Sequence, residues 1–135
     1  MKLVGSVPSI PFGEFHGAVL ARMDFPMCAI GVAERPTGSY VPFHRHEHAT
    51  VVALLEGEHR GERADGSELW SMAHAWYYRP PGEVHQHLKC ETPIRGLGIH
   101  FQRELVGDAA LPTESLCFDS ALGRSLCASL LDALQ

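Results

Sequence analysis

Apolar and polar residues alternate along much of this chain, in short runs that end at turn-forming residues. Alternation with a period of two places successive side chains on opposite faces of a β-strand. Many short strands at even spacing are typical of an all-β sandwich or barrel, so we expect a barrel over about residues 15–102. The predicted strands are residues 16–25, 28–34, 39–46, 50–56, 59–64, 67–72, 75–79, 84–90 and 94–101.

Glycine and proline separate these strands. Asp65-Gly66 predicts a two-residue hairpin turn in which both central residues have positive φ. Pro36-Thr37-Gly38, Glu56-Gly57 and Pro80-Pro81-Gly82 mark further turns.

The pattern changes after Arg103. A short irregular stretch contains Pro112, and Asp119 then predicts the cap of a helix over about residues 120–134. Its leucines recur at helical spacing, and we expect them to pack against the barrel; a dimer contact or the start of a linker is the alternative. The chain is thus interpreted as one domain, 1–135, with a barrel and a helical segment at about 103–135. The leucines concerned are Leu122, Leu126, Leu130, Leu131 and Leu134.

Composition agrees with a single globular domain. The chain has 135 residues, of which 45% are hydrophobic and 20% charged, and a net charge of -5. A negative chain without a basic face argues against nucleic-acid binding. The longest apolar run, 51–55, is too short to cross a bilayer, and no signal peptide is evident, so we expect a cytoplasmic protein. The four cysteines form no CxxC pair and are interpreted as reduced core residues.

Histidines carry the chemistry of this sequence. Eight of the nine lie between His44 and His100. His44 and His46 are two residues apart on a predicted strand, so both face the same side. His85 follows a turn and begins another strand, with His87 on the same face. Neutral imidazoles bind zinc, iron, nickel, manganese or copper, and three of them leave coordination positions open.

Two segments also resemble the motifs of the cupin family. Residues 38–57 contain the glycine, the two alternating histidines and the closing glycine of the first cupin motif, although Thr50 stands where that motif has a glutamate. Residues 79–85 contain the Pro-x-Gly-x-x-His centre of the second motif, with His74 in place of its opening glycine and Lys89 in place of its final asparagine.

This resemblance implies a double-stranded β-helix, the jelly-roll barrel of cupins, and a divalent metal held by His44, His46 and His85. Pirin-like cupins place a further ligand two residues after the second-motif histidine, which here is His87. His48 and His100 are weaker substitutes. The alternative is a metal-free pocket in which the imidazoles hydrogen-bond a small ligand or one another.

Other side chains are assigned from strand position. Glu47 and Glu83 are interpreted as solvated charges that point away from the cluster. Only one face of residues 76–79 can look into the barrel. The histidines interpreted as surface or rim residues are His16, His59 and His74, and the residues proposed to line the ligand pocket are Thr50, Trp76, Tyr78, His100 and Phe101.

Two functions follow as hypotheses. The run from His44 to Phe101 resembles the amino-terminal, effector-binding cupin of AraC-type transcriptional regulators, which implies small-molecule sensing, a homodimer and a role in transcription regulation. A separate carboxy-terminal unit would read DNA in that family, and this chain alone shows none. The alternative is a small metal-dependent cupin enzyme, similar to a dioxygenase or an isomerase, in which the metal acts as a Lewis acid. Because no carboxylate is placed in the barrel, binding is favoured over catalysis.

Overall fold

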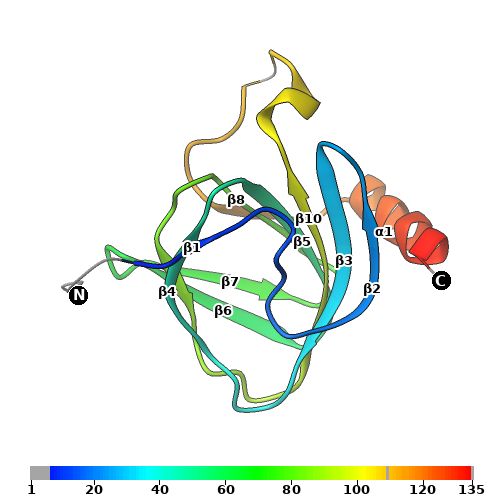
Figure 1. The fold of residues 1–135 in the computed structure, drawn as a ribbon. Helices are drawn as coiled ribbons and strands as arrows, with labels where there is room; N and C mark the ends of the chain where they lie inside the picture. The colour runs from blue at the N-terminus through cyan, green and yellow to red at the C-terminus, as the bar shows by residue number, and fades with distance from the viewer. Residues whose placement is uncertain (1–6, 109, 135) are drawn as a thin grey trace.

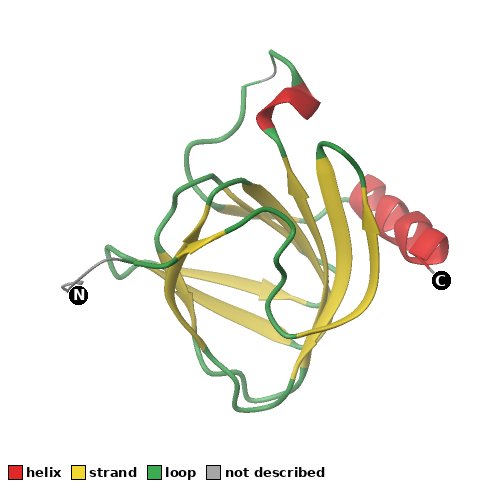
Figure 2. Cartoon of the chain, viewed as in Figure 1, coloured by secondary structure: helices red, strands yellow, loops and turns green. Residues whose placement is uncertain are grey.

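The computed structural model describes residues 7–108 and 110–134, which form two facing β-sheets and one C-terminal helix (Figures 1 and 2). This is the all-β barrel with a C-terminal helix that the sequence predicts. One sheet has the strand order β1 (Ser9–Ile10), β4 (Val41–His46), β9 (His85–His87), β6 (Glu58–Arg63) and β7 (Glu68–Met72). The other has the order β11 (Leu116–Phe118), β8 (Trp76–Arg79), β5 (Ala49–Glu56), β10 (Ile94–Phe101), β3 (Cys28–Arg35) and β2 (Ala18–Asp24).

Alternation along each strand separates the interior of the barrel from its outer face. On β5, Thr50 and Val52 line an internal cavity, whereas the neighbouring Val51 and Ala53 pack in the cluster outside the sheet. Strands β3, β8 and β10 follow the same rule, because a strand turns successive side chains to opposite faces. Both faces of the six-stranded sheet are therefore buried over much of their area.

Helix α1 (Ala121–Leu134) covers part of the outer face of this sheet (Figure 1). The predicted cap is wrong by one residue: the Ser120 hydroxyl accepts a hydrogen bond from the Gly123 amide at 2.9 Å, and Asp119 instead pairs with Arg124 at 2.6 Å. Ser120 has the shorter side chain and reaches the free amides of the first turn. The helix residues that pack against the sheet are Cys127, Leu130, Leu131 and Leu134.

The leucine stripe of α1 is only partly covered. Leu122 and Leu126 are 79% and 50% exposed, so the expectation that all five leucines pack on the barrel is wrong for these two. They lie in the first two turns of the helix.

Strand bounds agree closely with the sequence pattern where alternation is long. β10 covers the predicted residues 94–101, and β3 exceeds its prediction by one residue. The second-motif strand was predicted too long, since β9 contains only His85–His87. β1 and β11 were not predicted, because two or three residues are too few for a periodic signal.

The turn at Asp65-Gly66 differs from the predicted type. Only Gly66 has positive φ, at 89°, so the expectation for Asp65 is wrong. The Asp65 carboxylate instead accepts hydrogen bonds from the Ser67 amide and hydroxyl, at 2.9 and 2.6 Å. An aspartate side chain that accepts a hydrogen bond from the residue two positions ahead stabilises a turn without requiring a positive φ at the aspartate itself.

Gly57, the last residue of the segment that resembles the first cupin motif, occupies a position that requires glycine. Its φ is 91°, and an added Cβ would collide with the carbonyl oxygen of Pro93. Replacing Gly57 with alanine combines left-handed strain with this backbone collision, and we expect a loss of about 2–4 kcal/mol in the free energy of unfolding. Urea unfolding measures it. Gly82→Ala is the matched control, since Gly82 has φ 79° but nothing near an added Cβ; equal losses in the two variants would contradict the collision.

The four cysteines are free thiols: Cys90 is buried, Cys28 and Cys127 are half-buried, and Cys117 is exposed. Their interpretation as core residues is therefore wrong for Cys117, whose thiol lies 3.1 Å from the Ser71 hydroxyl. Among the described residues, no helix has both the length and the apolar character needed to cross a membrane.

Candidate metal centre

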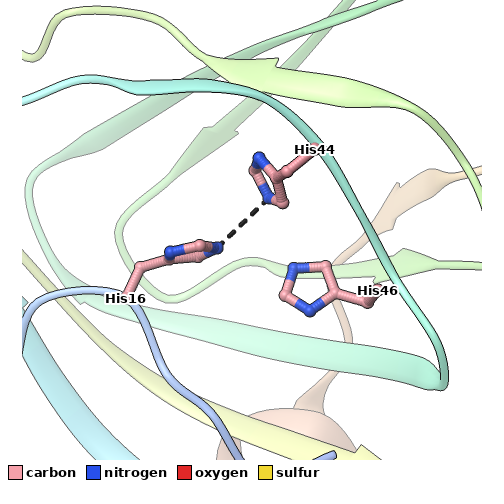
Figure 3. A group of neighbouring side chains, drawn as sticks. All are labelled: His16, His44 and His46. Atoms are coloured by element: carbon pink, nitrogen blue, oxygen red, sulfur yellow. Dashed lines mark hydrogen bonds between the residues drawn. The ribbon is translucent and has the colours of Figure 1, made fainter. Parts of the chain in front are cut away.

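Histidines from three parts of the chain meet inside the barrel. His44 and His46 come from β4, His85 and His87 from β9, and His16 from the loop before β2. The register of β4 and β9 sets His44 opposite His85, so the two motifs that resemble cupin motifs face each other. Figure 3 shows the rings of His16, His44 and His46 gathered around a common space.

These histidines form two groups that share His44. One ring nitrogen from each of His16, His44 and His46 lies within 4.8 Å of the other two, and the same holds for His44, His85 and His87. The Nε2 atoms of His16 and His44 are 3.1 Å apart (Figure 3). The predicted ligands His44, His46, His85 and His87 are thus brought together, and His16 joins them.

Backbone carbonyls orient two of the rings. The Nδ1 atom of His44 donates to the Pro42 carbonyl at 2.7 Å, and that of His85 donates to the Glu83 carbonyl at 3.0 Å. A proton held on Nδ1 leaves the Nε2 lone pair free, which is how metal-binding histidines are usually oriented.

Several ring nitrogens of the cluster are buried without a hydrogen-bond partner among the described residues: His46 Nδ1, His85 Nε2 and His87 Nδ1. A buried polar atom without a partner is rare and calls for an explanation such as an ion. A donor set made of neutral imidazole nitrogens suits a divalent transition metal. The residues present therefore fit such an ion.

The protonation state favours metal binding as well. Burial lowers the pKa of His16 to about 3, with further lowering by the neighbouring His44 and Arg35. Burial likewise lowers the pKa of His44, His46 and His85 below the usual value. These imidazoles are neutral at pH 7, and the neutral form is the one that binds a metal.

A cavity opens beside the cluster. Its volume is about 80 Å³, enough for several waters or a small ligand. The predicted pocket residues Thr50 and His100 line it, together with His46 and His87. The ring of His100 accepts a hydrogen bond from the Gly13 amide at 3.2 Å.

Three predicted pocket residues lie elsewhere, on the outer face of the six-stranded sheet. Trp76 packs in the cluster that contacts α1. Tyr78 packs with Phe101, and its hydroxyl donates to the Pro112 carbonyl at 3.1 Å. The prediction is wrong for Trp76 and Tyr78 because alternation on β8 turns Tyr77 and Arg79 into the cavity instead. It is wrong for Phe101 because the neighbouring His100 takes the cavity side of β10.

The histidines assigned to the surface divide into two kinds. His74 is exposed, as predicted, and has φ 73° where the cupin motif has glycine. His16 and His59 are wrongly assigned: both line the cavity, and His59 is only 1% exposed. His48 is neither in the two groups nor along the cavity. No motif contains His16 or His59, so no sequence signal marked them.

Glu83 is not the solvated charge that the sequence suggested. Its side chain is 14% exposed and lies 3.4 Å from the guanidinium of Arg79, which is itself 2% exposed. Arg79 also donates to His59 Nε2 at 3.2 Å. Glu83 therefore compensates a buried positive charge at the side of the cavity.

A scan against protein-family models and a search of curated proteins found no match to this chain. Solved structures do match. A cupin domain from Bordetella pertussis Tohama I is 20% identical with a TM-score of 0.53, and the alignment covers 67% of this chain and 99% of that one. A cupin superfamily protein from Desulfitobacterium hafniense DCB-2 is 15% identical with a TM-score of 0.55, covering 65% and 82%.

The DMSP lyase DddQ from Ruegeria pomeroyi DSS-3 is also similar, at 20% identity and a TM-score of 0.52, covering 67% of this chain but only 42% of the lyase. This chain therefore spans less than half of that enzyme's length. Together these likenesses show that the chain has the cupin fold.

Proposed function

We propose that this protein is a cupin-fold binding module that holds a divalent metal on the histidine cluster and receives a small molecule in the adjoining cavity. The observation that carries the proposal is a cluster in which histidine ring nitrogens approach within 4.8 Å of one another, and in which several buried ring nitrogens have no partner among the described residues. When bound, the metal supplies a Lewis-acidic centre with positions open to a ligand.

A binding role is favoured over catalysis because no carboxylate of the described residues belongs to the histidine groups. Both histidine groups consist of imidazoles alone. Thr50, where the cupin motif has glutamate, is 3% exposed and carries no proton-accepting group of useful basicity. Glu14 is the one acidic residue among the described cavity-lining residues, and it is exposed.

The finer form of the proposal is a sensor similar to the effector-binding domain of AraC-type regulators, acting as a homodimer. The partly exposed leucines of α1 support this form, since Leu122 and Leu126 offer an apolar contact on a helix that follows the barrel. A metal-dependent enzyme is the alternative, and slow turnover of a bound small molecule by the metal-loaded protein would favour it.

Metal loading tests the proposal directly. The purified, untagged protein is stripped with a chelator, loaded separately with Zn²⁺, Mn²⁺, Fe²⁺, Ni²⁺ and Cu²⁺, desalted and submitted to elemental analysis. We expect near-stoichiometric retention of at least one metal, because a preformed set of neutral imidazoles binds without ligand deprotonation. Retention of none of them under any loading condition would overturn the metal site.

A further inference from the structure

Arg35 is a buried positive charge for which the described residues provide no counter-ion. It ends β3, lines the cavity and is 7% exposed. Its Nη1 atom has no hydrogen-bond partner, and the described residues give it no ion pair. Burying an uncompensated charge costs several kcal/mol, so a fold that keeps one there needs an anion to offset it.

Arg79 shows the contrast on the other side of the same cavity. Its guanidinium lies 3.4 Å from the Glu83 carboxylate and 3.2 Å from His59 Nε2. The charge of Arg79 is therefore compensated within the protein, whereas that of Arg35 is left to the cavity. Glu14 also lines the cavity, but it is exposed and makes no ion pair with Arg35.

The local backbone leaves room for Arg35 to occupy this position. Gly17 has φ 93°, and an added Cβ would lie 2.8 Å from the Arg35 Cγ atom. On the neighbouring strand β10, Gly96 and Gly98 line the same cavity without side chains. An added Cβ at Gly98 would lie 3.1 Å from the ring of Phe15. Because these glycines have no side chains, the Arg35 guanidinium and the Phe15 ring both fit beside the same cavity.

The rest of the lining near these residues is apolar. It comprises Phe15, Ala33, Val52, Leu54 and Ile94. A free inorganic anion would gain nothing from such walls, whereas a small molecule with an apolar body and one anionic group would bury that body. The planar fork of a guanidinium matches a carboxylate with two parallel hydrogen bonds.

We propose that the ligand of this cavity is a small organic acid whose carboxylate binds Arg35 and whose apolar body lies against the Phe15 and Val52 side. This inference rests on the proposed binding function and names its ligand class. His46 and His87 of the cluster line the same cavity as Arg35. A bound metal would add positive charge and strengthen the preference for an anion.

The test compares butyrate with butyramide, which has nearly the same shape but no charge. Binding is measured by calorimetry and by the thermal midpoint, at millimolar ligand, on the full chain in metal-free and metal-loaded forms. We expect butyrate to bind and raise the midpoint, and butyramide to do neither. Arg35→Met should weaken butyrate binding by about 30-fold or more. Failure of both butyrate and benzoate to bind, or equal binding of butyramide, would overturn the proposal.

Two variants separate a ligand role from a structural one. Ligand-free Arg35→Met should unfold at or above the wild-type midpoint, because an apolar side chain replaces an uncompensated buried charge. Arg45→Met is the matched control: Arg45 is exposed on β4 and should leave butyrate binding unchanged. A lower midpoint in Arg35→Met, or unchanged butyrate binding, would identify Arg35 as a structural residue and overturn the inference.

Elemental analysis of the same samples keeps the two proposals apart. If Arg35→Met retains metal but binds butyrate as wild type does, the ligand class is wrong and the metal site stands. If wild type retains no metal but binds butyrate through Arg35, the metal site is wrong and the ligand class stands. Binding of inorganic phosphate in place of butyrate would contradict the organic acid.

Discussion

His44→Ala is expected to weaken metal binding by about 100-fold or more, since structural zinc sites gain about 10–16 kcal/mol from about four ligands and the loss of one removes about 3 kcal/mol. His44 is the ring common to both histidine groups, so its loss leaves each group with only two of its three ligand atoms. Elemental analysis and competition with a chelator measure the loss.

The fold should survive this substitution. The ring of His44 contacts the other histidines of the cluster, and its Nδ1 hydrogen bond to the Pro42 carbonyl is within the same strand. Far-UV circular dichroism of His44→Ala should therefore match that of the wild type. Adding His85→Ala should bring retained metal close to zero, because it removes a ligand atom already free of other partners.

His74→Asn provides the control for histidine loss in general. His74 is exposed, lies outside both groups and has φ 73°, a conformation that asparagine tolerates. Its metal content should equal that of the wild type. Global unfolding of His44→Ala, or equal metal loss in His74→Asn, would contradict a site centred on His44.

The motif histidines could be predicted because strand alternation and motif spacing act locally. His44 and His46 lie two residues apart on one strand, and the turn that ends at Gly82 sets the start of the strand of His85 and His87. Their mutual approach needs only the pairing of β4 with β9. The two-sheet fold followed from the same alternation.

His16 could not be predicted, because a loop brings it to the cluster and no periodicity constrains a loop. Burial of Arg35 and Arg79 was missed for another reason. A charged residue is ordinarily exposed, and no local sequence pattern indicates that a barrel will enclose it. The choice between the two faces of β8 likewise depended on pairing with β5, where Thr50 lies opposite Arg79.

The metal-free protein is expected to lose stability steeply as pH falls below about 6.5, the ordinary pKa of histidine. Burial lowers the pKa of His100 to about 4 and of His16 to about 3 in the folded state. Between 6.5 and these values the unfolded chain binds protons that the folded chain does not, so the free energy of unfolding falls as pH falls. Each such histidine contributes about 1.4 kcal/mol per pH unit.

Several buried histidines act together here, since burial also lowers the pKa of His46, His59 and His87. A few of them suffice to offset a total stability of about 5–15 kcal/mol before about pH 4. Urea unfolding at intervals between about pH 7.5 and about pH 4.5 measures the slope. Bound metal should raise stability above pH 6.5 and steepen the fall, because protons displace it from the imidazoles.

His59→Gln isolates one histidine that belongs to neither metal group. The glutamine carbonyl can accept the hydrogen bond that Arg79 gives His59 at 3.2 Å, while it removes the titrating ring. The slope of unfolding free energy against pH should then decrease by about 1.4 kcal/mol per pH unit. An unchanged slope would show that His59 titrates alike in both states, and a wild-type protein equally stable at about pH 4.5 and about pH 7.5 would contradict a neutral, buried cluster.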